Sequence, residues 1–141
     1  MRRAALLLAI LALAGCGGDD ESASEFAVRV IGLLEAGNAG AAWDELHPAH
    51  RSAIPRPLYV RCEGSDGLGG DVGSLEVAGV REERSTVPGQ GEAAGTEVAL
   101  SFALDGEPVE LDMHVFEIDG EWGWVVGKND YAAYATGDCP G

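Results

Sequence analysis

The stretch from Thr96 to Val126, TEVALSFALDGEPVELDMHVFEIDGEWGWVV, decides the fold. Apolar residues occupy every second position in its first two segments, which is the period of a strand with one buried face. The pairs Asp105-Gly106 and Asp119-Gly120 separate the segments. Both positions of a tight hairpin turn prefer positive φ, which aspartate and glycine tolerate, so each pair predicts a two-residue hairpin. The stretch therefore predicts three consecutive antiparallel strands.

A further strand is expected upstream of this stretch. Apolar residues from Leu75 to Val80 begin it, and it runs toward Arg84. The segment 88–95 is rich in turn residues, so we expect it to connect this strand to the next one. The segment 64–73 is rich in glycine and aspartate. This composition predicts a loop between a helical half and a strand half of the chain.

The residues before this loop favour helices. Ser22 and Glu25 have the spacing of a capping box, in which the serine caps the first turn and the glutamate reaches back. Apolar residues follow at helical spacing as far as Gly37-Asn38, which end the helix. Shorter helices are expected over residues 39–46, 48–54 and 55–63. Helices followed by an antiparallel meander of about four strands predict an α+β domain.

The N-terminal residues have the pattern of an export signal. Arg2 and Arg3 precede the uncharged apolar run 4–14. About eleven helical residues cover about 16 Å, roughly half of the ~30 Å hydrocarbon core, so the run is too short to span a bilayer but fits a secretory signal. The run ends in residues 13–16, LAGC, which resemble the lipobox of bacterial lipoprotein signal peptides at every position.

The lipobox resemblance implies a chemical fate for Cys16. In lipoproteins the cysteine thiol receives a diacylglycerol, and a peptidase then cuts ahead of the cysteine; two acyl chains suffice for stable anchoring. We therefore expect residues 1–15 to be a removed signal peptide and residues 16–24 to be the lipidated Cys16 with a flexible acidic tether. The domain then covers residues 25–141, at the extracytoplasmic face of the cell membrane. An ordinary signal peptide, leaving Cys16 a free thiol, is the alternative.

Cysteine and charge content agree with export. Once Cys16 carries lipid, Cys62 and Cys139 remain as a pair, and an oxidising compartment favours a disulfide between them. The formal net charge of −15 argues against nucleic acid and anionic lipid headgroups as partners, because both would be repelled. A soluble acidic surface is the simpler explanation of this charge.

The order of elements resembles the NTF2-like (cystatin-like, cone-shaped) superfamily, and in particular small actinobacterial lipoproteins with such a domain. The residues that carry the resemblance are the helix 25–35 with its Gly37-Asn38 stop, the segment 41–48 (AAWDELHP) and the segment 119–127 (DGEWGWVVG). The resemblance implies N-terminal helices packed on a curved antiparallel sheet, often with a pocket at the wide end of the cone. Some members are isomerases or dehydratases and many only bind ligands or partners, so the fold does not decide the activity.

We expect a non-catalytic module that binds a small apolar ligand or an envelope protein, with no metal and no cofactor. Aromatic residues at such spacing are more often core than pocket, but four are candidates for lining a pocket: Trp43, Tyr59, Trp122 and Trp124. Two alternatives remain open. One is an isomerase- or dehydratase-like enzyme, and the other is a structural protein of envelope assembly that dimerises through the outer face of the sheet.

The enzyme alternative depends on His114. Strand alternation places His114 and Asp112 on the face opposite Met113 and Val115, and therefore toward solvent if the apolar face meets the helices. A slip or bulge near Phe116 would reverse part of this pattern. A surface histidine beside acids is the simpler interpretation.

Two further segments contain side chains that can bind metal ions. His47 and His50 with Asp44 offer zinc ligands, but Pro48 breaks the helix that would align them. The segment 66–71 contains two aspartates, and Ca²⁺ requires six to eight oxygen ligands. Its glycines also lack the lysine and hydroxyl of a phosphate-binding loop. Neither segment predicts a site.

Overall fold

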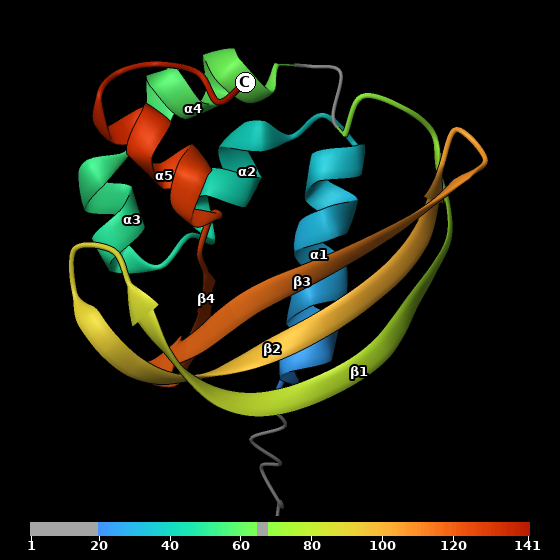
Figure 1. Cartoon of the computed structure of the whole chain (residues 1–141), viewed down its shortest axis with the longest axis horizontal. Coiled ribbons are helices and arrows are strands. Elements are labelled where there is room, and N and C mark those ends of the chain that lie inside the picture. The colour runs from blue at the N-terminus through green and yellow to red at the C-terminus, as the bar shows by residue number, and fades with distance from the viewer. Residues whose placement is uncertain (1–19, 65–67) are drawn as a thin grey trace, which may run out of the picture.

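The computed structural model describes residues 20–64 and 68–141, and over these residues it has the predicted α+β architecture (Figure 1). The helices are α1 (Ala23–Glu35), α2 (Ala39–Asp44), α3 (Pro48–Ala53), α4 (Arg56–Glu63) and α5 (Lys128–Ala135). The strands are β1 (Val72–Val87), β2 (Gly91–Leu104), β3 (Glu107–Ile118) and β4 (Glu121–Trp124), and they form one antiparallel sheet in that order. The expected signal peptide and Cys16 lie outside the described residues.

The two aspartate–glycine pairs form the predicted tight hairpins. Asp105 and Gly106 have φ values of 51° and 84°. They are the only two residues between Leu104 and Glu107, which pair with each other across the hairpin. Asp119 and Gly120, with φ values of 53° and 82°, are likewise the only residues between the paired Ile118 of β3 and Glu121 of β4. Both hairpin predictions are confirmed.

The core lies between α1 and the inward-facing rows of β2 and β3. Val98 pairs with Met113, and both are buried, as is Val115 two residues further along β3. On α1, Phe26 and Val30 are fully buried. Burying one such side chain contributes about 1.5–3 kcal/mol, so this interface provides much of the stability of the fold. Figure 1 shows the strands curling across α1, with α2 to α5 gathered at the end of the sheet where β4 lies.

The first helix begins earlier than the expected domain boundary at residue 25. Ser22 caps α1, its hydroxyl accepting from the Glu25 amide at 3.2 Å while its own amide donates to the Glu25 carboxylate at 2.8 Å. The capping box is therefore confirmed, and residues 22–24 belong to the folded domain and not to a tether. Glu21 is held as well, because its carbonyl accepts from the Trp122 indole at 2.6 Å and its carboxylate pairs with Arg29 at 2.8 Å.

The turn expected over residues 88–95 is wrong for most of that range. β1 continues to Val87 and β2 begins at Gly91, so only three residues turn the chain. Residues 91–95 instead belong to β2, and one of them makes room for a neighbouring side chain. A Cβ on Gly95 would lie 2.5 Å from the Phe116 ring, so the absent side chain lets Phe116 pack across the strand.

The C-terminal helix α5 is an element that the sequence did not predict. Tyr134 anchors it, since this side chain is buried and its ring lies 5.5 Å from the ring of Tyr59 in α4. The predicted pairing of Cys62 with Cys139 is confirmed, with a Cα–Cα distance of 5.3 Å, and it joins the end of α4 to the segment after α5. Among the described residues, no helix combines the length and the apolar character needed to cross a membrane.

Removing the disulfide should destabilise the fold. Cys62 and Cys139 are 77 residues apart in the sequence, and closing a loop of that length is valued at about 4 kcal/mol by the chain-entropy model. We expect the double variant Cys62→Ser, Cys139→Ser to lose up to about that much free energy of unfolding, measured by urea denaturation with circular dichroism. Reductant should shift the midpoint of the wild type and leave the double variant unchanged. An equal response of the two proteins would contradict the prediction.

Candidate functional site

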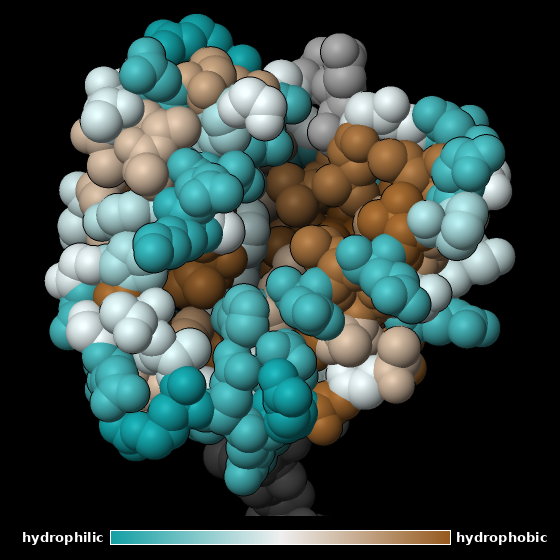
Figure 2. Space-filling model, in the orientation of Figure 1, coloured by the Kyte–Doolittle hydropathy of each residue, from teal (hydrophilic) through white to brown (hydrophobic). Residues whose placement is uncertain are grey.

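A hollow opens where β3 extends beyond its neighbour. β4 pairs only with residues 115–118, so residues 107–114 of β3 have no strand beside them on that edge. Leu111 belongs to the inward-facing row because it pairs with the buried Leu100, yet it is 36% exposed. An inward-facing side chain that is exposed must face a space open to solvent. Figure 2 shows this space as a hollow between the helices and β3, lined by apolar side chains.

We call this space the apolar hollow and define it by Val109, Leu111 and Met113, the three apolar inward-facing residues in the unpaired part of β3. The row that faces inward beside them on β2 is apolar too, and it consists of Leu100, Phe102 and Leu104. Glu107 continues the β3 row opposite Leu104 and is exposed at the hairpin end. Between Val109 and Met113, and between Leu100 and Leu104, no inward-facing residue is charged or can form a side-chain hydrogen bond. These two rows therefore offer apolar contact area and no acid or base.

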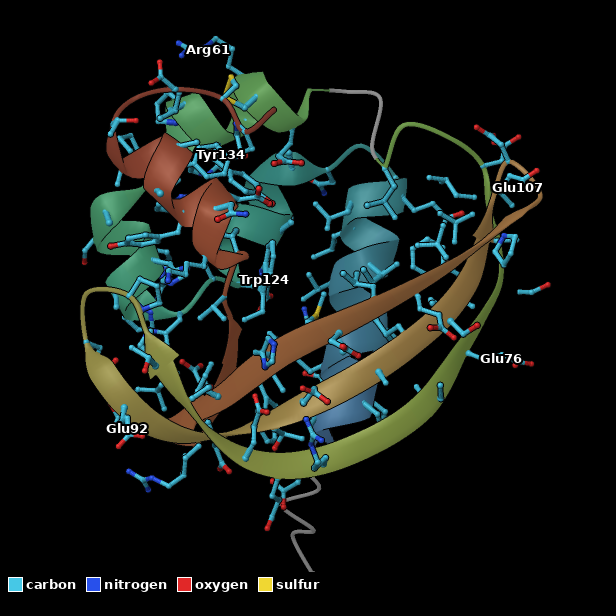
Figure 3. The ribbon with its side chains drawn as sticks, viewed as in Figure 1. Arg61, Glu76, Glu92, Glu107, Trp124 and Tyr134 are labelled. Carbon is cyan, nitrogen blue, oxygen red and sulfur yellow. A yellow bond between two sulfur atoms is a disulfide. The ribbon has the colours of Figure 1, made fainter. Side chains whose placement is uncertain are left out.

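Of the four aromatic residues proposed to line a pocket, three pack in or against the core and one lines a groove elsewhere. Tyr59 and Trp124 are buried in edge-to-face contact with ring centroids 6.5 Å apart, and the Trp124 indole donates to the Ala42 carbonyl at 2.8 Å. Trp43 is partly buried and donates to the Ile54 carbonyl at 2.8 Å. Figure 3 shows Trp124 between the helices and β3, so this residue is core at the border of the hollow.

Trp122 instead lies in an acidic groove on another side of the molecule. The groove has a volume of about 1060 Å³, and Glu21, Glu45 and Glu121 are among its lining residues. Arg29 also lines it but is bound within the protein, because Glu21 and Glu45 hydrogen-bond its guanidinium and raise its pKa. The groove therefore presents mainly negative charge, which would repel anionic ligands.

An ionic cluster lies on the outer face of the sheet, opposite the apolar hollow. Glu97 of β2 pairs in register with His114 of β3, and Arg81 of β1 pairs with Glu97 on the other side. The His114 Nδ1 lies 2.5 Å from a Glu83 carboxylate oxygen, and the Arg81 guanidinium contacts both Glu97 oxygens at 2.8 and 2.9 Å. Glu83, Glu97 and His114 each offer one metal-binding atom, and these atoms lie within 4.8 Å of one another.

The position of His114 bears directly on the enzyme alternative. The residue faces outward, as strand alternation predicts, and Asp112 is exposed on the same face. A ligand in the apolar hollow would lie on the other side of the sheet. Sequence reasoning found His114 but missed Glu83, because only the pairing of β1 with β2 brings that residue beside the histidine.

His47 and His50 are structural groups of the helical layer. The Nδ1 of His47 accepts from the Ala49 amide at 3.0 Å and so caps α3. The Nδ1 of His50 accepts from the Val126 amide at 3.3 Å, which joins α3 to the chain after β4. Asp44 does not join them, because its carboxylate pairs with Arg56 at 3.2 Å.

The two aspartates of the segment 66–71 do not form a calcium site among the residues that the structure describes. Asp66 lies outside the described residues. Asp71 uses its backbone to hold the β2–β3 hairpin: its amide donates to the Asp105 carboxylate and its carbonyl accepts from the Asp105 amide, both at 2.9 Å. This end of the glycine-rich segment is therefore bound to the sheet by its main chain.

The buried His50 imidazole should make the fold sensitive to acid. Burial, together with nearby His47, lowers the pKa of His50 from 6.5 to about 4, so the folded state favours the neutral ring. The stability that depends on the neutral ring is complete above pH 6.5 and is lost as the pH falls toward 4, because the unfolded chain takes up the proton first. The loss should reach about 3 kcal/mol.

The variant His50→Asn tests this pH dependence. Asparagine does not titrate, and its side-chain oxygen can accept the Val126 amide in place of the Nδ1 of His50. The difference in unfolding free energy between wild type and variant, measured in urea at several pH values, should shrink as the pH falls from 7 to 4. A difference that stays constant over this range would rule out the assigned role of His50.

Comparison of this chain with protein-family models, with curated proteins and with solved structures finds no match in any of the three. No activity, ligand or residue role can therefore be carried over from another protein. The function has to be inferred from the hollow, the outer face and the N-terminal residues of this chain.

Proposed function

We propose that this protein is a lipid-anchored module on the extracytoplasmic face of the membrane, and that its domain binds a small uncharged apolar ligand without catalysing a reaction. The observation that carries the proposal is Leu111, which faces inward and is 36% exposed, because no residue that the structure describes covers the apolar hollow. We also assign the domain to the NTF2-like architecture. Its support is the curved sheet packed on N-terminal helices, with an opening beside the longer strand.

The chemistry of the hollow favours an apolar ligand. Fully covering an exposed leucine side chain contributes about 1.5–3 kcal/mol, and a ligand in the hollow would gain part of this by covering Leu111, which is 36% exposed. From Val109 to Met113 and from Leu100 to Leu104, the inward-facing rows hold no charged partner for an ionic ligand. A formal net charge of −15 also repels anions such as fatty-acid carboxylates, so an uncharged molecule is the best match.

Export and anchoring are supported by two independent features. The LAGC motif at residues 13–16 has the residues that lipidation requires. The Cys62–Cys139 disulfide suits an oxidising compartment outside the cytoplasm. Because Glu21 is bound to Arg29 and Trp122, the proposed tether shortens to residues 16–20, and five residues can span at most about 17 Å.

Lipidation can be tested directly in a bacterial host grown with labelled fatty acid. The full chain should incorporate the label and partition with membranes, whereas Cys16→Ala should lose the label, because the only thiol that accepts the lipid is gone. The double variant Cys62→Ala, Cys139→Ala serves as the matched control and should keep the label. An unlabelled wild-type chain, or label that persists in Cys16→Ala, would refute the lipoprotein assignment.

Ligand binding by the hollow can be tested with a neutral fluorescent probe such as N-phenyl-1-naphthylamine. Residues 16–141, made without lipid, should bind the probe with enhanced fluorescence. The variant Leu111→Glu should weaken binding by about tenfold or more, because a carboxylate beside an apolar ligand is costly to desolvate. Val28→Glu is the matched control, since Val28 is 37% exposed and lies on α1 outside the inward-facing strand rows.

Circular dichroism should show that both variants remain folded, so that lost binding is assigned to the hollow. Two results would count against the proposal. One is a wild-type protein that does not bind the probe, and the other is an equal loss of binding in Leu111→Glu and Val28→Glu.

A further inference from the structure

Three ligand-type side chains meet on the outer face of the sheet, from three adjacent strands. Glu97 and His114 are directly opposite each other across β2 and β3. Glu83 is the next outward-facing residue of β1 after Arg81, which itself lies opposite Glu97. Because paired strands hold these positions, the site depends on side-chain rotation and not on the folding of a loop. Figure 3 shows the strands that carry these side chains.

The three groups are near enough to one another for their side chains to reach one metal ion. Their candidate ligand atoms all lie within 4.8 Å of one another. Zinc–nitrogen and zinc–oxygen bonds of about 2.0–2.2 Å place neighbouring ligand atoms roughly 3.3 Å apart, so small side-chain rotations would bring the three atoms to one ion. The Glu83 and Glu97 side chains are mostly shielded from solvent, which limits the entropy lost on binding.

We propose that Glu83, Glu97 and His114 bind a divalent transition-metal ion such as Zn²⁺, with a fourth coordination position open to water. Two carboxylates balance the charge of the ion, and the imidazole nitrogen favours zinc, copper or nickel over calcium or magnesium. Ca²⁺ and Mg²⁺ prefer sites built from more oxygen ligands. The site is independent of the apolar hollow, because it lies on the opposite face of the sheet.

The positive charge of Arg81 lies beside the same two carboxylates that would bind the ion. Its guanidinium contacts both oxygens of Glu97 and lies 3.7 Å from Glu83, so it neutralises the carboxylates when no ion is bound. The Arg81 side chain is 69% exposed and can turn away into solvent. Arginine and metal ion are therefore competitors for the same two carboxylates.

This competition separates a metal site from a simple network of ion pairs. If the cluster is only a network of ion pairs, removing Arg81 leaves the affinity for metal ions unchanged. In a metal site, Arg81 is an inhibitor whose removal tightens binding. The remaining histidines do not confuse the assignment, because His47 and His50 are buried and their Nδ1 atoms already accept backbone amides.

The experiment is a calorimetric titration with ZnCl₂. It uses tag-free residues 16–141, which contain every described helix and strand, with Cys16→Ser so that this thiol cannot bind the ion. We expect one ion per chain. Binding should weaken by about tenfold or more in His114→Ala and Glu97→Gln, and it should tighten by about tenfold in Arg81→Gln. Circular dichroism confirms that each variant is folded.

Glu76→Gln is the matched control for the acidic surface. It removes the same charge as Glu97→Gln from an outward-facing position on β1, and Figure 3 shows this side chain pointing away from the sheet. Its affinity for zinc should equal that of the unaltered chain. The proposal is overturned if His114→Ala binds zinc normally, if Arg81→Gln weakens or does not change binding, or if Glu76→Gln and Glu97→Gln lose affinity equally.

Discussion

The register between β2 and β3 determines which side chains meet α1 and which meet solvent. The two-residue turn Asp105-Gly106 fixes that register, because it leaves no spare residue between the strands. A slip of β3 by one residue would turn Met113 outward and bring Asp112 and His114 against the core. Burying an unpaired carboxylate and an imidazole costs several kcal/mol, so the apolar core and the turn favour the same pairing. The other strands and the helices are arranged around this pair.

The same register creates two different surfaces on one strand. Leu111 and His114 lie three residues apart on β3, and alternation sends them to opposite faces. On the inner face, β4 ends early, and an apolar row that would otherwise be covered is left open beside α1. On the outer face, the pairing of β1 with β2 and of β2 with β3 brings Glu83 to His114. A ligand inside and an ion outside would therefore contact the same strands without meeting each other.

Sequence reasoning succeeded where a local rule determines the structure. The alternating strands, both aspartate–glycine hairpins and the capping box of α1 follow from neighbouring residues. It failed where tertiary contact decides. Helix α5 has no side-chain N-cap, and it is held by Tyr134 and by the disulfide at Cys139. Residues 91–95 have the composition of a turn but belong to β2, where Gly95 makes room for the Phe116 ring. Glu83 could not be paired with a histidine 31 positions away without knowing the sheet order.

Anchoring through Cys16 would also set where the hollow lies relative to the membrane. The tether joins the domain at Glu21, which is bound at the start of α1, whereas the hollow opens beside the C-terminal half of that helix (Figures 1 and 2). Residues 16–20 can span at most about 17 Å, about twice the Debye length of about 8 Å at physiological ionic strength, so full extension would take the acidic groove near Glu21 beyond most of the repulsion from anionic lipids. In the proposed lipoprotein, the anchored start of α1 and the hollow are therefore at different ends of this helix. An apolar ligand would enter the hollow at the end remote from the anchor.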